Sequence, residues 1–353
     1  MRFDTPQACR QLEAAAASGT VCAARRPETH RMRKVLGYAG IGLAALSTAA
    51  AYAQGSFPAK PVRIVVPFPA GGTADVLPRI VGEELSKRWK QPVIVENRTG
   101  ANGNIAASFV YRSDPDGYTT LWSPPGPLAI NQYLYKTLAF DPTRFAPITI
   151  LGSEPNALSV GPSSQFSSIG DIVAYARNHP GKLSVASQGV GSTSHLTAEM
   201  LQDLAGIRMT HVPYQGAVPA LADVMSGQVD LFFGSLGSSF TYFKANRLKI
   251  IALTDSKRSD RVPAIPTAAE SGFSELISTT WFGVVAPPNT PQDIVRKISH
   301  DVNEILKMPE VIDRFIKQGA APMGATPEES SRFMKAEGER WHGIIKAAAI
   351  TLD

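Results

Sequence analysis

The stretch VRIVVPFPAGGTADVLPRIVGE (Val62–Glu83) decides the fold. Its first five residues predict a strand covered on both faces, because β-branched side chains pack well in a buried sheet. Gly71 and Gly72 permit backbone conformations that a Cβ forbids, and Asp75 or Thr73 can cap the helix that follows. Such a loop presents free N–H groups at a helix N-terminus beyond the carboxyl end of a strand. That position favours an anion. A tight turn without a ligand is the alternative.

The pattern of strand, polar loop and helix recurs along the chain. Loops rich in Gly, Ser, Asn or Pro at residues 67–72, 97–103, 123–127, 187–194 and 213–217 each follow an expected strand and precede an expected helix. This alternation predicts βαβ units and parallel sheets, with the loops at the same edge of each sheet. Two sheets that face each other at that edge would form a cleft rimmed by backbone amides and hydroxyls. Residues 145–160 suggest two extended pieces around 152–156, and we interpret them as a first crossover to a second domain. Residues Ser278 to Val285 are also expected to be extended, and they could return the chain from the second domain to the first.

The first 53 residues differ from the rest. Arg31, Arg33 and Lys34 precede an apolar run that ends at Ala51-Tyr52-Ala53, the pattern of a secretory signal peptide cleaved before Gln54. Met32 is the expected true start, and a membrane anchor is the rival interpretation. The seven basic and three acidic residues of this segment account for most of the net charge of +5, which leaves about +1 for the remainder. A nearly neutral chain gives no reason to expect a nucleic-acid partner.

The chain after residue 53 offers little catalytic or metal-binding chemistry. Both cysteines, Cys9 and Cys22, lie in the segment expected to be removed. No two histidines stand three or four positions apart, so no metal site or cofactor is expected. The run from Gly189 to Ser194 resembles a dinucleotide fingerprint but lacks its third glycine. A secreted hydrolase using Ser192, His195 and Asp230 stays open, although these residue types occur together in most proteins.

Several short motifs occur in one order along nearly all of residues 56–353. They are Phe57-Pro58, Lys60 to Phe68, Gly71-Gly72, Asp75, Val95 to Arg98, Gly100-Ala101, Pro115 to Tyr118, Gly191-Ser192, Ser194 to Leu196, His211 to Tyr214, Gly227 to Asp230, and Trp281 to Gly283. Together they resemble the tripartite tricarboxylate transporter substrate-binding proteins, also called Bug receptors.

The resemblance implies an α/β fold with two Rossmann-like lobes of the type II periplasmic-binding-protein kind, joined by two crossovers. The expected lobes are residues 56–158 with 275–353, and residues 159–274. The implied function is a monomeric periplasmic receptor, not an enzyme. It would hold a small organic acid in the cleft and deliver it to integral membrane transporter subunits. An extracellular sensor for the same ligands is the alternative.

The resemblance also implies which residues contact the ligand. The loops would do so with amides, hydroxyls and ordered waters rather than with a salt bridge. Asp75 and Asp230 would support these contacts from behind. The ligand-binding residues expected by position are Phe68, Ala70, Gly71, Gly72, Ser123, Glu154, Gly189, Gly191, Ser192, Thr193, His195, Tyr214 and Gln215.

Two residues depart from the family's pattern. Gly234 stands where many relatives have Asp, and Asn102 replaces a common Gly. The first change would remove a contact to a ligand amine. We therefore expect a di- or tricarboxylate or an aromatic acid rather than an amino acid.

Overall fold

The computed structural model describes residues 57–347 and residue 350. Strand β1 (Val62–Val66) lies between β2 (Val93–Asn97) and β3 (Thr119–Ser123) and pairs in parallel with both. Val62, Ile64 and Val66 pack on one side of the sheet and Val65 on the other. The prediction of a strand covered on both faces is therefore confirmed. The expected signal peptide, its cleavage site and the start at Met32 lie outside the described residues.

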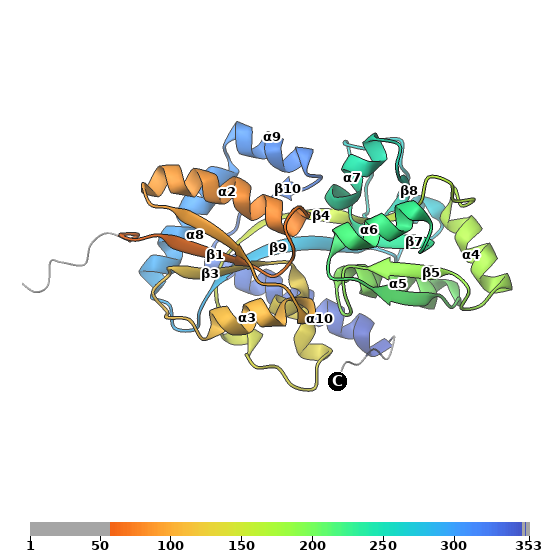
Figure 1. Ribbon diagram of the computed structural model, residues 1–353. Coiled ribbons are helices and arrows are strands. Elements are labelled where there is room, and N and C mark those ends of the chain that lie inside the picture. The colour runs from red at the N-terminus through yellow and green to blue at the C-terminus, as the bar shows by residue number, and fades with distance from the viewer. Residues whose placement is uncertain (1–56, 348–349, 351–353) are drawn as a thin grey trace, which may run out of the picture. The chain divides into compact units, whose positions relative to one another are not determined.

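Two long strands connect the halves of the sheet (Figure 1). Strand β4 (Ala146–Val160) runs for 15 residues, and β9 (Thr279–Ala286) pairs with it in antiparallel fashion. The prediction of two extended pieces in residues 145–160 is wrong, because residues 146–160 form a single strand. Gly152 and Pro155 both pair with residues of β9, and the register of the pairing shifts just before Gly152. Strand β9 also pairs with β3 in antiparallel fashion, so the sheet is mixed rather than wholly parallel.

Beyond β4 the sheet continues in a second half. Strand β5 (Ser184–Ser187) pairs in parallel with β6 (Thr210–Pro213) and with β7 (Leu231–Ser235). Strands β7 and β8 (Lys249–Leu253) pair with the far end of β4. The short β10 (Ala321–Pro322) pairs with the middle of β4. The strand order is β2-β1-β3-β9-β4-β7-β5-β6.

Helices cover both faces of each half. In the half that contains β1, one face carries α2 (Thr73–Trp89), α8 (Gln292–Leu306) and α9 (Pro309–Lys317), and the other carries α3 (Asn104–Tyr111) and α10 (Pro327–Ala347). In the second half, α4 (Ile169–Asn178) and α5 (Thr193–Ala205) share one core, and α6 (Ala217–Ser226) packs on the opposite face. Short turns at Ala101–Gly103, Gly126–Ile130, Asn131–Tyr133, Pro142–Arg144 and Ala269–Ser271 complete the described structure.

Each half has its own apolar cores. The cores around β1 combine residues up to 151 with residues from 281 onward, whereas those of the second half draw on residues 158–276. The described residues nevertheless belong to one compact unit. The lobe boundaries 56–158 with 275–353 and 159–274 therefore stay a prediction. No helix among the described residues is both long enough and apolar enough to cross a bilayer.

One helix is absent from the sequence-based expectations. Helix α7 (Leu236–Lys244) follows β7 directly. The junction between the two elements, Ser235-Leu236-Gly237-Ser238, has a position and a Gly/Ser composition similar to those of the five recognised loops. A sixth junction between strand and helix therefore lies at the carboxyl end of a parallel strand.

Candidate functional site

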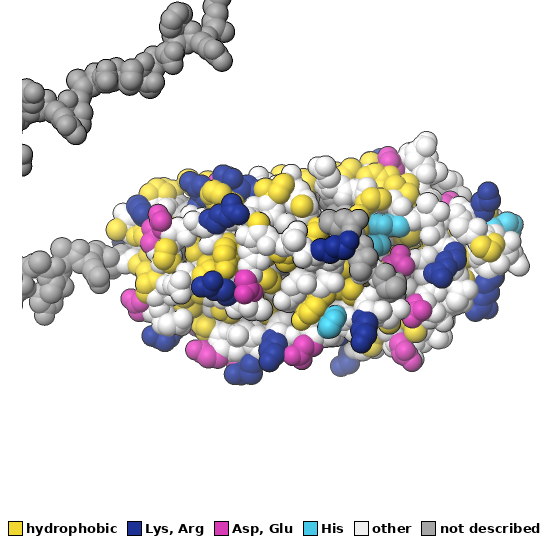
Figure 2. All heavy atoms as spheres, turned by 90° about the horizontal axis from the view of Figure 1, so that it is seen from below, with side chains coloured by type: hydrophobic (Ala, Val, Ile, Leu, Met, Phe, Trp, Pro, Cys, Tyr) yellow, Lys and Arg dark blue, Asp and Glu magenta, His cyan; other side chains and the backbone are white. Residues whose placement is uncertain are grey.

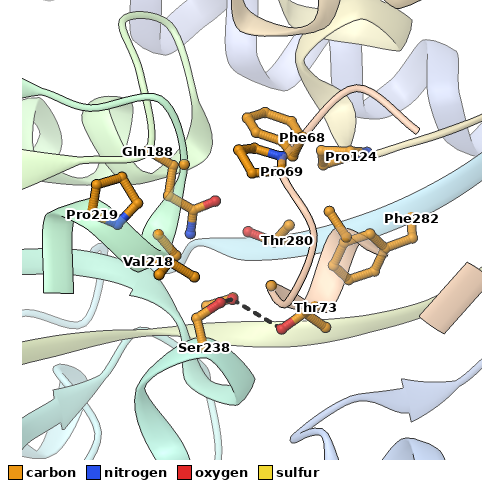
Figure 3. Close-up of a pocket in the computed structure, with 15 residues that line it drawn as sticks. Phe68, Pro69, Thr73, Pro124, Gln188, Val218, Pro219, Ser238, Thr280 and Phe282 are labelled. Atoms are coloured by element: carbon orange, nitrogen blue, oxygen red, sulfur yellow. Dashed lines mark hydrogen bonds between the residues drawn. The ribbon is translucent and has the colours of Figure 1, made fainter. Parts of the chain in front are cut away.

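The loops at the carboxyl ends of the strands meet around a small cavity between the halves of the sheet (Figure 3). We call it the inner cavity. Its volume of about 30 Å³ corresponds to roughly one water molecule, so the two halves are closed against each other here. None of its lining side chains carries a charge. The lining residues are Phe68, Pro69, Gly72, Thr73, Ala74, Pro124, Gln188, Gly216, Ala217, Val218, Pro219, Ser235, Ser238, Thr280 and Phe282.

A larger pocket of about 240 Å³ adjoins the inner cavity and shares Phe68, Pro69 and Gln188 with it. We call it the outer pocket. It has no charged lining side chain either, and two tyrosines stand in its wall. Its other lining residues are Pro67, Thr99, Gly100, Ala101, Asn102, Gly103, Tyr135, Gly189, Val190, Pro213, Tyr214 and Gln215.

The first loop is held from behind by a carboxylate. Gly72 is the N-cap of α2 and makes no side-chain cap bond, so the prediction that Asp75 or Thr73 caps this helix is wrong. Asp75 instead reaches back to accept a hydrogen bond from the Gly71 N–H, at 3.1 Å. The exposed Ala70 and Gly71 line neither the inner cavity nor the outer pocket. No described residue accepts from the N–H of Gly72 or Thr73, both of which border the inner cavity.

Asp75 is the centre of a charged network. Burial raises the pKa of its carboxyl, but hydrogen bonds from Arg79, Asn97 and the Gly71 amide outweigh burial and lower the pKa below its usual value. Asn97 also donates to the carbonyl of Phe68, at 2.8 Å, and so fixes both ends of the loop. Asp75 therefore lies behind the first loop and is hydrogen-bonded to it, and its role in supporting ligand contacts stays a prediction.

We expect Asp75→Asn to lower the free energy of unfolding by about 1–3 kcal/mol at pH 7, because it removes the charge from a buried hydrogen-bonded network. The native pKa lies below the unfolded one, so the stabilisation is present above about pH 4 and disappears as the pH falls further. Urea denaturation at pH 7 and pH 3 measures this difference. The control Asp313→Asn removes an ion pair whose side chains are 58% and 69% exposed, and it should have little effect. Equal losses in both variants would contradict the prediction.

The second loop is held mainly by its own hydrogen bonds. Ser192 is the N-cap of α5: its Oγ accepts from the His195 N–H, and its hydroxyl donates to the Gly189 carbonyl, at 2.7 Å. The Gly191 N–H donates to His195 Nδ1, at 3.1 Å. Thr193 shares a hydrogen bond of 2.7 Å with Thr280, which lines the inner cavity. Of the five expected residues in this loop, only Gly189 lines a cavity directly.

His195 is buried and forms a pair of imidazoles with the half-buried His211 behind the loop. Its ring stacks on His211 with centroids 3.9 Å apart, and its Nε2 lies 3.5 Å from a carboxylate oxygen of Glu199. Burial, together with repulsion from His195, lowers the pKa of His211 to about 4, although Glu199 opposes this change. His211 in turn lies 2.6 Å from the hydroxyl of Ser187. The pair therefore supports the loop and does not line either cavity.

The remaining predicted residues have different positions. Tyr214 and Gln215 line the outer pocket, and the Tyr214 hydroxyl donates to Asp223 at 2.5 Å. Ser123 is buried and donates to the carbonyl of Pro124, which lines the inner cavity. Asp230 accepts from the amide and hydroxyl of Ser184, at the opposite ends of β5 and β7 from the loops.

Ser192, His195 and Asp230, the residues of the alternative hydrolase, each have other hydrogen-bond partners. The hydroxyl of Ser192 donates to a backbone carbonyl, His195 accepts from a backbone amide, and Asp230 binds Ser184. No hydrogen bond joins any two of these three side chains, although the His195 backbone N–H donates to Ser192 Oγ. Among the described residues no group of three His, Cys, Asp or Glu side chains could hold a metal ion.

Five polar residues that line the inner cavity were not predicted. Ser235 ends β7, Ser238 lies in the first turn of α7, and Gln188 lies in the loop after β5. Thr73 begins α2, and Thr280 lies in β9. The Gly/Ser composition of residues 234–239 was a usable signal for the two serines. Thr280 lies within an extended crossover strand and gave no such signal.

The two departures from the family pattern are both well packed. A β-carbon at Gly234 would lie 2.1 Å from the ring of Phe232, so that ring fills the space a larger residue would need. Asn102 has a left-handed backbone with φ of 49°, and its amide donates to Asn131 at 2.9 Å.

The chain is similar to known receptors over most of its length. The sequence model described as "Tripartite tricarboxylate transporter family receptor" matches residues 77–350. Protein BugT of Bordetella pertussis is 32% identical, with 91% of this chain and 99% of that protein aligned.

Solved structures agree. An R. palustris protein solved with adipate is 36% identical with a TM-score of 0.81, covering 84% of this chain and 99% of that one. MatC from Rhodopseudomonas palustris, with bound malate, is 30% identical with a TM-score of 0.78, covering 82% and 100%. The protein therefore belongs to the receptors of the tripartite tricarboxylate transporter family, which are periplasmic solute-binding proteins.

Proposed function

We propose that the protein captures a small organic acid between the two halves of its sheet and delivers it to integral membrane subunits of a transporter. It acts as a monomer in the periplasm and does not turn its ligand over. The observation that carries this proposal is an uncharged inner cavity bordered by unpaired amides at the start of α2 and by hydroxyls from both halves.

An anion suits these groups. Helix N-termini carry partial positive charge, and amides that have no other acceptor can bind a carboxylate without a competing bond. Charge-assisted hydrogen bonds contribute about 1.5–3 kcal/mol each, so several of them can replace one arginine. The adipate and malate of the two R. palustris relatives are carboxylates of this kind.

The apolar walls restrict the choice of acid. Phe68, Pro69, Pro124, Pro219 and Phe282 surround the polar groups of the inner cavity (Figure 3). No described acidic side chain lines either cavity to pair with an ammonium group. A di- or tricarboxylate or an aromatic acid therefore fits better than an amino acid.

Capture requires the halves to separate and close again, because the inner cavity holds about one water molecule. Strands β4 and β9 are the two connections about which such a hinge would bend. On the surface, basic and acidic side chains lie interspersed over the face shown in Figure 2, without a broad patch of one sign.

Thermal denaturation with adipate, malate, citrate, benzoate and glutamate tests the proposal, using protein first unfolded and refolded to remove bound acids. At a concentration of a hundred times Kd, an acid that binds should stabilise the protein by about 2.7 kcal/mol. Thr280→Val keeps the shape of the side chain but loses its hydroxyl, and it should reduce this stabilisation. If none of the acids gives a saturable shift, capture of organic acids is refuted.

The absence of turnover has its own test. Activated esters should be hydrolysed no faster by the wild type than by His195→Ala. Hydrolysis that disappears in the variant would instead support the hydrolase with Ser192 and His195.

A further inference from the structure

Glu154 is a buried carboxyl beneath the inner cavity. It lies in β4 and is 1% exposed. Its Oε2 accepts a hydrogen bond from the N–H of Gly237, at 2.8 Å, and its Oε1 has no partner among the described residues. A buried carboxylate with so few donors is costly, whereas a carboxylic acid is tolerated.

The groups around Glu154 compensate a negative charge only in part, because each of them lowers the pKa of its carboxyl by less than burial raises it. The hydroxyls of Thr73 and Ser235 and the amide of Gly237 lie beside it, and Arg261 acts on it from a distance. The guanidinium of Arg261 donates instead to the carbonyls of Ile316 and Lys317 and stacks on Phe240. Burial therefore dominates and raises the pKa of Glu154 to about 8.

Only one layer of hydroxyls separates Glu154 from the inner cavity. Thr73 and Ser235 both line that cavity, and their oxygens lie 3.4 Å apart across the contact between α2 and the start of α7. Ser235 also shares a hydrogen bond of 2.8 Å with Ser238. An anion in the cavity and a charge on Glu154 would therefore repel each other through a medium of low dielectric constant.

We propose that Glu154 must be protonated for the receptor to hold its solute, so that capture of an anion and ionisation of Glu154 exclude each other. This inference rests on the proposed function and adds the protonation state that the site requires. Two consequences follow from linkage. Affinity falls by up to about tenfold for each pH unit above the pKa of Glu154, and the protein takes up a proton when it binds an acid at alkaline pH.

Isothermal titration calorimetry with adipate, malate and benzoate from pH 6 to pH 10, at constant ionic strength, tests this. The wild type should bind at least one acid with constant affinity up to about pH 7.5 and progressively more weakly above pH 8. Glu154→Gln keeps the shape and the acceptor for Gly237, so it should retain the affinity and lose the pH dependence. The control Glu199→Gln removes the carboxylate beside His195 and should keep the pH dependence.

Proton uptake gives a second measurement that needs no variant. Titrations at pH 9 in two buffers of different ionisation enthalpy should show close to one proton taken up per acid bound. Binding that is independent of pH, without proton uptake, overturns the inference but leaves the proposed function intact. If the wild type binds none of the acids even at pH 6, both the function and the inference fail.

Discussion

The variant Gly237→Ala should bind its solute about tenfold more weakly or worse. A β-carbon at Gly237 would lie 1.8 Å from the carbonyl oxygen of Gln318 and 2.8 Å from both Thr73 Oγ1 and Glu154 Oε2. Gln318 follows α9 in the first half, whereas Gly237 begins α7 in the second. The added methyl therefore separates the halves where they touch. Overpacking of this kind costs about 1–3 kcal/mol, and here the cost falls on the closed state.

Calorimetry with the acid that binds the wild type best measures the effect of Gly237→Ala. Gly343→Ala is the matched control, because no atom lies within 4 Å of the added carbon, which points to open space from α10. That control should bind normally and be slightly more stable, since alanine favours a helix over glycine. Wild-type affinity in Gly237→Ala would mean that solute capture does not require this contact.

The second large effect is one of stability. Glu154→Gln should raise the free energy of unfolding by several kcal/mol at pH 8, with an upper limit near 5 kcal/mol, and change it little at pH 4.5. The native pKa of about 8 is above the usual 4.5, so in the wild type the stability linked to this proton is complete below pH 4.5. That stability is lost as the pH rises toward 8, because the carboxyl ionises more readily in the unfolded chain. Glutamine does not ionise, so the variant keeps its stability.

Guanidinium denaturation of both proteins at pH 4.5, 6 and 8 measures this difference. It should grow steadily with pH. A constant difference across the three pH values would show that Glu154 titrates normally in the folded protein. Such a result would also remove the physical basis for the link between protonation and solute capture.

Local patterns were enough to predict most elements of the fold. Strand β1 was expected at its observed bounds because its β-branched residues suit a strand buried on both faces. Gly152 and Pro155 looked like breaks in β4, but pairing with β9 overrides their weak strand preference. Helix α7 was overlooked because it is short and begins with small residues.

The site was less predictable because it depends on contacts between distant segments. Of the residues expected from the sequence, Phe68, Gly72, Tyr214 and Gln215 line the two cavities, as Gly189 does, and their contacts with a ligand stay a prediction. The sequence could not show that Asp75 uses the Gly71 amide, nor that His195 stacks on His211. Both contacts form only when the loops are folded, so they cannot be predicted from the composition of the loops.

The division of the first half's core between the two ends of the chain has a consequence for biogenesis. Trp89 and Asp301, which lie 212 positions apart, share a hydrogen bond there, and α8 and α9 complete the layer over α2. The middle of the chain can form its own core during synthesis, whereas the beginning lacks its packing partners until α8 and α9 have been made. Such a delay would favour export through a channel that accepts only unfolded chains, because the N-terminal segment cannot fold stably before the C-terminal helices have been synthesised.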